Sequence, residues 1–327
     1  MSRIVVIGSA TQDIYMLDCD DFEGMEVDEN VSIFGKMTIG SKVDIDRVNF
    51  EVGGSGTNAA VTFARHGHET IFMGNLGRDA SGDAVLECLD RENIDSSYVE
   101  FIEGHTGCSV VLVDVRHADR TILAYRGASA NFDNLNPDDL DNIQPDWLYV
   151  TSLRGNMEKL LEFFEKAHKI GAKVMFNPGE KELEQTDKLI GLLDLVDVLL
   201  VNKEEAAQIV PGVLLTELIT HLSNYCKIVL VTDGMMGAIA TNRKQTYRLG
   251  VYEQKRVRDR TGAGDAFGSG FLAALASGAK FAKALEFAAA NASVVTQKYG
   301  AKAGILTGQE ELHEMPIQKV EENAEWQ

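Results

Sequence analysis

The stretch Asp259–Phe267 combines a carboxylate with a run of small residues at the start of an apolar helical pattern. Gly262, Ala263 and Gly264 leave their backbone amides open at the helix N-terminus, where the positive end of the helix dipole favours an anion. During phosphoryl transfer, such amides would stabilise the charge on the transferred group. We expect an ordinary pKa to keep Asp265 ionised at neutral pH, so that it could accept a proton from an attacking alcohol. The alternative is that Asp265 only caps the helix.

Two further motifs could bind the hydroxyl groups of a substrate. The paired glycines Gly53 and Gly54 open a predicted helix that carries Asn58, and Asn58 offers both a donor and an acceptor. Asp13 ends the segment that follows the first predicted strand, and its carboxylate could accept from two hydroxyls. Glycine-rich turns and capping aspartates are also common in turns without a ligand.

Two motifs at predicted strand ends could bind a nucleotide and its metal. Asn202 and Glu205 stand three residues apart on a first helical turn and would face the same way, as a hydrated Mg²⁺ and phosphate oxygens require. A helix cap followed by acidic residues is the alternative. The segment that contains Thr232, Gly234 and Gly237 could bind a nucleotide through its backbone.

Other well-known sites are missing from the sequence or weak. There is neither a Gly-x-x-x-x-Gly-Lys-Ser/Thr phosphate loop nor a Gly-x-Gly-x-x-Gly that follows a strand. His66 and His68 lie at a predicted helix end, and we expect them to be surface residues rather than metal ligands.

Composition narrows the class of partner. The 50 acidic and 31 basic residues give a formal net charge of −19, which argues against a nucleic-acid partner. The four cysteines are scattered without a Cys-x-x-Cys, so we expect neither a zinc site nor a disulfide framework. No apolar run approaches the ~18 residues of a membrane span. We therefore expect a soluble cytoplasmic protein with no membrane partner.

Short apolar runs alternate with helical patterns, which predicts an α/β fold with a mostly parallel sheet covered by helices on both faces. Ligands of such sheets lie at the carboxyl ends of the strands. Predicted strands are Ile4–Ile7, Thr70–Met73, Trp147–Val150, Lys173–Phe176, Val198–Val201 and Ile228–Val231, and predicted helices are Thr57–His66, Ala80–Glu92, Met157–Ile170 and Leu214–Tyr225.

Residues Leu17–Val52 and Phe101–Tyr125 break this rhythm with alternating apolar and polar residues. Alternation of this kind indicates strands with one exposed face. We expect the two segments to form a small projecting sheet that acts as a lid. The charged tail after Glu311 is not assigned to any element.

In order, these motifs resemble those of the ribokinase-like, or PfkB-type, carbohydrate kinase family. The resemblance runs from Ile4 to about Gly304 and rests mainly on Gly53–Gly67, Asn202–Glu205 and Asp259–Phe267. It implies one catalytic domain over residues 1–327, in which a small β-lid covers the substrate.

The resemblance also implies roles for the residues above. Asp265 would be the general base, and the amides of Gly262, Ala263 and Gly264 would form the anion hole. The remaining sets are Asp13, Gly53, Gly54 and Asn58 for the substrate hydroxyls; Asn202, Glu205, Thr232, Gly234 and Gly237 for the nucleotide, with Glu205 holding Mg²⁺ through water; and Asp259, Thr261 and Gly300 for K⁺.

The substrate is less constrained. Ser55 replaces the lysine of the ribokinase pattern, and Thr151–Leu153 stand where a sugar-binding glutamate is expected, so ribose is doubtful. Arg126 could meet an acidic or phosphorylated substrate, although a solvated charge at a strand end is the alternative. The expected reaction is transfer of the γ-phosphate of MgATP to a hydroxyl of a small sugar or sugar acid.

Two other functions remain open on the sequence. A nucleoside kinase of the same family would need an apolar lid, which Phe34, Phe50 and Phe101 could provide. A sensor without catalysis would bind ligand but would not need Asp265. The exposed alternating strands would also permit a homodimer through the lid.

Overall fold

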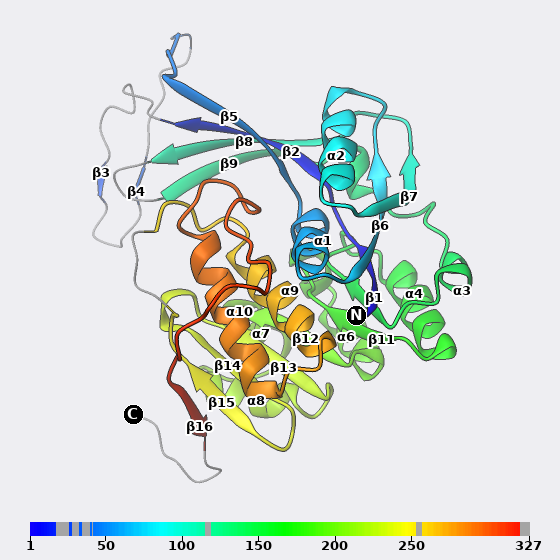
Figure 1. Cartoon of the computed structure of the whole chain (residues 1–327), viewed down its shortest axis with the longest axis vertical. Helices are drawn as coiled ribbons and strands as arrows, with labels where there is room; N and C mark the ends of the chain where they lie inside the picture. Colours follow the sequence, from blue (N-terminus) through cyan, green and yellow to red (C-terminus); the bar gives the residue numbers. More distant parts are fainter. Residues whose placement is uncertain are drawn as a thin grey trace.

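The computed structural model describes residues 1–17, 26–27, 33–34, 40, 42–114, 119–252 and 257–320. Within this part of the chain, the main sheet has the order β16-β15-β14-β13-β12-β11-β10-β1-β6-β7 (Figure 1). The strands from β7 to β13 are parallel, and the last three are antiparallel. The strands are β1 (Arg3–Ile7), β6 (Glu69–Leu76), β7 (Asp95–Phe101), β10 (Trp147–Val150), β11 (Lys173–Phe176), β12 (Val198–Asn202), β13 (Ile228–Thr232), β14 (Ala238–Thr241), β15 (Thr246–Leu249) and β16 (Ile317–Val320).

All six predicted strands are present, with ends that differ by a few residues at most. Their apolar runs form strands because helices cover both faces of the sheet. Alternate residues of β1 show this: Val6 belongs to one buried core and Val5 to the other. The mostly parallel sheet expected from the sequence is confirmed.

The helices divide between the two faces (Figure 1). On one face lie α1 (Ser55–Arg65), α2 (Ala80–Arg91), α9 (Ala263–Ala276) and α10 (Phe281–Val295). On the other lie α3 (Asp139–Ile143), α4 (Met157–Ile170), α5 (Glu180–Leu183), α6 (Thr186–Leu192), α7 (Lys203–Ile209) and α8 (Leu215–Leu222). Among the described helices, none is long and apolar enough to cross a membrane.

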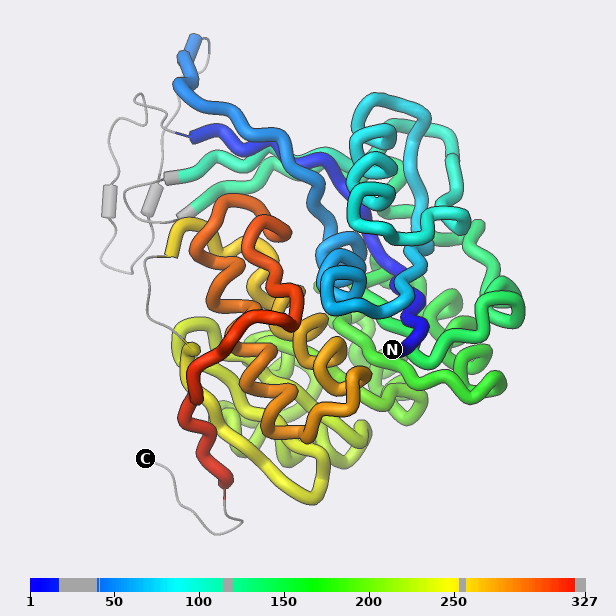
Figure 2. Tube along the Cα trace, in the orientation of Figure 1, coloured from blue at the N-terminus to red at the C-terminus, as the bar shows by residue number. Residues whose placement is uncertain are grey.

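A second sheet projects from the body in the order β5-β2-β8-β9, as Figures 1 and 2 show. Its strands are β2 (Thr11–Leu17), β5 (Arg47–Gly53), β8 (Gly107–Asp114) and β9 (Asp119–Tyr125). Separately, β3 (Glu26–Val27) pairs antiparallel with β4 (Ile33–Phe34). The expected lid sheet is thus present, although residues 18–25, 28–32, 35–39, 41 and 115–118 of the predicted segments lie outside the described residues.

The boundaries of the lid differ from the prediction in one respect. Strand β2 begins at Thr11, so the lid starts before Leu17, where the sequence placed it, and already includes Asp13. Its alternate residues are buried, from Thr11 to Leu17, because one face of the lid packs over the body.

The charged tail, which the sequence left unassigned, contains the last strand of the main sheet. In β16, Ile317 to Val320 pair antiparallel with β15. Figure 2 shows the C-terminal segment, in red, running across the body to that edge.

Candidate active site

Helix α9 begins at the predicted anion-binding turn. Its N-cap is Gly262, whose φ of 77° lies in the left-handed region. A Cβ on this residue would lie 2.4 Å from the Cβ of Ala301, so both the backbone conformation and the close packing require glycine. The segment after α10 therefore presses against the start of α9.

The three predicted amides are not equivalent. The amide of Ala263 donates to the carbonyl of Arg260 at 3.3 Å. Among the described residues, no backbone acceptor faces the amides of Gly262 or Gly264. The amides of Gly262 and Gly264 therefore differ from that of Ala263 in having no such backbone partner.

Asp265 lies on the first turn of α9, and its Oδ2 accepts a hydrogen bond from Nδ2 of Asn58 at 2.8 Å. The two predicted residues come from different ends of the sequence and meet because α1 packs beside α9. This hydrogen bond holds one of the two carboxylate oxygens, Oδ2. The expectation of an ordinary pKa is wrong: desolvation raises the pKa of Asp265, while the Asn58 hydrogen bond and the Lys302 charge oppose the rise.

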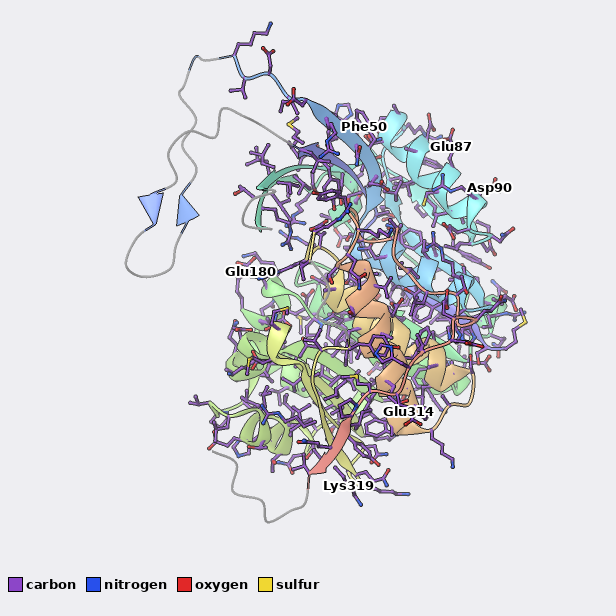
Figure 3. All side chains as sticks on the ribbon, turned by 60° about the vertical axis from the view of Figure 1, so that its left-hand side comes forward. Phe50, Glu87, Asp90, Glu180, Glu314 and Lys319 are labelled. Carbon is purple, nitrogen blue, oxygen red and sulfur yellow. The ribbon has the colours of Figure 1, made fainter. Side chains whose placement is uncertain are left out.

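This raised pKa predicts that Asp265→Asn unfolds at a higher temperature than the wild type at neutral pH. Above the folded-state pKa, the wild type carries a desolvated carboxylate that the amide variant lacks. Protonation at lower pH neutralises the wild-type group, so the difference should shrink as the pH falls through that pKa. Thermal unfolding at several pH values measures the effect, and Glu87→Gln, at an exposed position on α2 (Figure 3), is the control. A lower melting temperature for Asp265→Asn at neutral pH would contradict the prediction.

Asp13 lies on the inner face of the lid and is only 7 % exposed. Its Oδ1 accepts from Thr11 Oγ1 at 3.0 Å, and burial raises its pKa. On the neighbouring strand β5, Gly53 pairs with Thr11, two residues before Asp13. A Cβ on Gly53 would lie 1.9 Å from Asp13 Oδ2. Gly54, with a φ of 93°, then turns the chain into α1. The predicted pair of glycines thus makes room for Asp13 and starts the helix that carries Asn58.

We predict that Gly53→Ala displaces the Asp13 carboxylate and raises the KM of a hydroxyl-bearing substrate about 10- to 100-fold, which corresponds to the loss of a hydrogen bond to a charged group. Steady-state kinetics would measure it. Gly191→Ala is the control, because a Cβ at Gly191 meets nothing within 4 Å. An unchanged KM would show that Asp13 does not bind the acceptor.

Lys302 is a site residue that the sequence reasoning missed. Its side chain is buried at 6 % exposure, and its Nζ donates to Asn58 Oδ1 and to the carbonyl of Val52, both at 2.6 Å. Burial lowers the pKa of Lys302 to about 8, although Asp13, Asp265 and Glu51 act in the opposite direction. The only hint in the sequence is a lysine among small residues in Gly-Ala-Lys-Ala-Gly.

A pocket of about 360 Å³ lies beside the start of α9. Of the predicted nucleotide residues, it collects Asn202, Thr232, Gly234 and Gly237, but Glu205 does not line it. Sequence reasoning did not find the opposite wall, which comes largely from small residues of α10. The further lining residues are Met235, Gly250, Val251, Val257, Arg260, Ala263, Gly264, Phe267, Ala289, Ala292, Ser293 and Thr296.

Asn202 and Glu205 form a reciprocal cap at the start of α7. Asn202 Oδ1 accepts from the Glu205 amide, and Glu205 Oε2 accepts from the Asn202 amide, both at 2.8 Å. These two residues therefore form the helix cap that the sequence left open as an alternative. Desolvation raises the pKa of Glu205.

The predicted cation ligands Asp259, Thr261 and Gly300 also come together. Asp259 Oδ1 accepts from the amide and hydroxyl of Thr261 at 2.9 and 2.6 Å, and Oδ2 accepts from the Gly300 amide at 3.2 Å. Nε of Arg120, from lid strand β9, lies 3.5 Å from the same carboxylate. Among the described residues, no cluster of three His, Cys, Asp or Glu side chains could hold a metal ion.

The positions that depart from the ribokinase pattern meet in space. Ser55 Oγ donates to Thr151 Oγ1 at 3.0 Å, so two hydroxyls replace the expected lysine and glutamate. Arg126 lies at the end of β9 and is exposed.

Of the three aromatic residues considered for a nucleoside, Phe50 and Phe101 do not line the site. Phe50 points to the outer face of the lid and is 64 % exposed (Figure 3). Phe101 lies on β7 in the main sheet, 4.6 Å from the Arg78 guanidinium carbon. The side chain of Phe34 lies outside the described residues.

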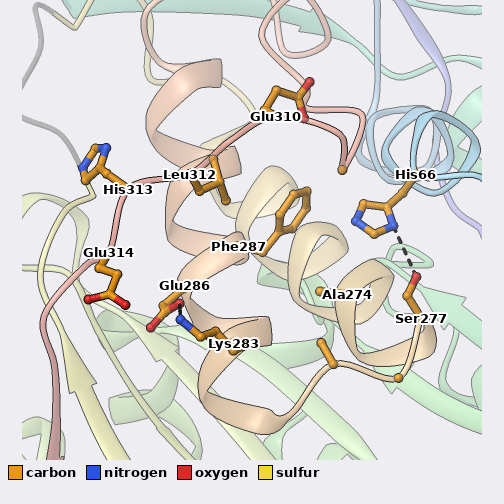
Figure 4. A pocket seen from close by; sticks show the side chains of 13 residues that line it. His66, Ala274, Ser277, Lys283, Glu286, Phe287, Glu310, Leu312, His313 and Glu314 are labelled. Atoms are coloured by element: carbon orange, nitrogen blue, oxygen red, sulfur yellow. Dashed lines mark hydrogen bonds and ion pairs between the residues drawn. The ribbon is translucent and has the colours of Figure 1, made fainter.

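The expectation that His66 and His68 are both surface residues is wrong for His68. It is 5 % exposed, and its ring nitrogens lie 3.2 Å from the Ser2 amide and 2.9 Å from the Ala273 carbonyl. His66 stacks on it and lines a second hollow of about 530 Å³ at the far end of α9 from Asp265 (Figure 4). Burial lowers the pKa of both imidazoles.

A family model described as pfkB family carbohydrate kinase matches residues 1–307. The chain belongs to this family. It is therefore an ATP-dependent carbohydrate kinase. The kinase is 27 % identical to the ribokinase of Bacillus subtilis over 263 residues, which cover 79 % of this chain and 85 % of that protein.

Solved structures show the same fold at lower identity. Adenosine kinase from Sinorhizobium meliloti superposes with a TM-score of 0.77 at 19 % identity, covering 94 % of this chain and 97 % of that one. Ribokinase from Cryptococcus neoformans var. grubii serotype A, in complex with ADP, gives 0.73 at 21 % identity, with 94 % and 98 % covered.

Proposed function

We propose that the kinase transfers the γ-phosphoryl group of MgATP to a hydroxyl of a small sugar or sugar acid, with Asp265 as the general base. The observation that carries this proposal is the Asn58–Asp265 hydrogen bond at the start of α9. The same helix start, through Ala263 and Gly264, lines the 360 Å³ pocket. The proposed base and the proposed anion-binding amides thus lie on the same first turn of α9.

The residues divide the reaction between them. Asp13 and Asn58 bind acceptor hydroxyls and orient one of them toward Asp265. Asp265 takes the proton of that hydroxyl as the oxygen–phosphorus bond forms and the bond to the leaving ADP breaks. The amides of Gly262 and Gly264 stabilise the charge on the transferred group. The lid covers the acceptor and excludes water, which would otherwise compete for the phosphoryl group.

The nucleotide side suits a magnesium complex. Glu205 uses Oε2 for its cap, which leaves Oε1 to bind a metal-bound water. Mg²⁺ supplies charge neutralisation on the phosphates when it is bound. Asn202, Thr232, Gly234 and Gly237 would contact the nucleotide, and Arg260 in the same pocket adds a positive charge.

We also assign Asp259, with the carbonyls of Thr261 and Gly300, to K⁺. The carboxylate is 3 % exposed and lies beside the anion-binding turn. Arg120 already places a positive charge 3.5 Å from it. Activity measured with and without K⁺ tests this assignment.

The inner face of the lid favours a neutral polyol. Asp13 and Glu51 are register partners and face the same side of the lid, where two carboxylates would repel an acid. A sugar acid could bind only if the positive charge of Arg126 offset this repulsion. A nucleoside acceptor loses support because Phe50 faces outward.

The test is ADP release from MgATP with a panel of pentoses, ketohexoses, sugar acids, sugar phosphates and nucleosides, with and without K⁺. Turnover on a neutral sugar supports the proposal. Turnover only on nucleosides would instead support a nucleoside kinase of the same family. Nucleotide or sugar binding without turnover on any acceptor would favour the sensor.

We further propose that the lid forms a homodimer. Register places Phe50, Ile14, Val110 and Leu123 in one row across all four strands of the outer face. Phe50 and Leu123 are 64 % and 55 % exposed, and such contiguous apolar surface is typical of an interface. Sedimentation of the wild type and of Phe50→Ser tests this, since a monomeric wild type would contradict it.

A further inference from the structure

Lys302 lies where three segments of the active site meet. Its Nζ binds the carbonyl of Val52, at the body end of lid strand β5, and Oδ1 of Asn58 on α1. Its own carbonyl accepts from Nη1 of Arg65 at 2.8 Å, near the end of α1. The preceding residue, Ala301, packs against Gly262 at the anion-binding turn. One buried side chain thus links the lid, α1 and the turn before α9.

The chemistry of these groups sets the orientation of the Asn58 amide. An ammonium group has three donors and no acceptor, so the Asn58 atom 2.6 Å from Lys302 is the carbonyl oxygen. The amide nitrogen therefore faces Asp265, to which it donates at 2.8 Å. If the amide rotated by half a turn, its oxygen would face the carboxylate, and two acceptors would oppose each other.

We propose that Lys302 is a positioning residue that holds the Asn58 amide in the orientation that donates to Asp265. This inference rests on the proposed function, because it assigns Asp265 to the reaction. Lys302 acts through Asn58 and does not touch the reacting atoms.

The test is a double-mutant cycle on the full chain with Lys302→Met, Asn58→Ala and the double variant. Lys302→Met keeps most of the stem but removes the donors, and we expect it to lower kcat about 10- to 100-fold while leaving the KM of ATP unchanged. In the Asn58→Ala background, we expect it to add little, because its route to Asp265 is already broken. Lys298→Met, the same change on an exposed lysine nearby, is the control.

A second variant separates positioning from stability. Lys302→Gln keeps an N–H donor for Asn58 without the charge, and we expect kcat to recover partly relative to Lys302→Met. Thermal unfolding of all variants identifies any that fail to fold. The inference would be overturned if the fold-loss of kcat in the double variant equalled the product of the two single losses. An unchanged kcat in Lys302→Met would overturn it as well. Absence of turnover in the wild type on every acceptor would instead reject the proposed function.

Discussion

Asp265→Asn is expected to lower kcat about 10²- to 10⁴-fold, the range that a general base contributes. The amide has the size of the carboxylate, and its oxygen can still accept from Asn58 Nδ2. It cannot take the proton of the acceptor hydroxyl, so the loss should appear in kcat. ATP affinity should stay close to the wild-type value, because Asp265 does not line the nucleotide pocket.

Single-turnover kinetics and calorimetric ATP titration would check this result. Asp90→Asn makes the same chemical change at an exposed residue near the end of α2 (Figure 3) and should leave both quantities unchanged. Near wild-type turnover in Asp265→Asn would show that another group is the base. Loss of ATP binding together with turnover would point to misfolding instead.

Gly262→Ala should lower kcat about 10²- to 10³-fold, as removal of a donor from an oxyanion site does. The new Cβ would lie 2.4 Å from the Cβ of Ala301 and 3.1 Å from its Cα, so the turn must move away from its present position. The left-handed conformation adds a cost of roughly 1–2 kcal/mol for alanine. Since Ala301 adjoins Lys302, the shift would also disturb the support of Asn58.

Gly278→Ala distinguishes displacement of the anion-binding turn from backbone strain as the cause of the loss. Gly278 follows the same helix at its other end and has a φ of 90°, but a Cβ there meets nothing within 4 Å. It should lose stability through backbone strain alone and retain turnover. Equal losses of kcat in both variants would contradict an anion-binding role for the Gly262 turn.

The sequence predicted best what depends on local pattern. Trp147–Val150 forms a strand at the predicted residues because four consecutive apolar side chains need burial on both faces of a sheet. The Thr11–Leu17 strand was missed in part, since its polar residues Thr11 and Asp13 are buried only because their face of the lid packs over the body. Strand β16 was missed because only two of its four residues are apolar, and its pairing depends on β15.

The site followed the same rule. Asp265 and Asn58 were identified from their motifs, yet the raised pKa of Asp265 comes from burial by residues distant in sequence. Lys302 could not be predicted, because its partners Val52 and Asn58 lie about 250 residues earlier in the chain. His68 is buried for a similar reason, through contacts with Ser2 and Ala273.

The lid has one mechanical consequence for catalysis. The chain passes between lid and body four times: between β1 and β2, β5 and α1, β7 and β8, and after β9. A hinge on a single strand would let the lid swing freely, but here any opening must flex four connections together. Asp13 and Gly53 adjoin two of these connections, so the residues that we propose to hold the acceptor also bear the bending. Stiffness of the lid and occupancy of the sugar site are therefore expected to change together, and a lid from another kinase could be grafted only by replacing both of its segments at once.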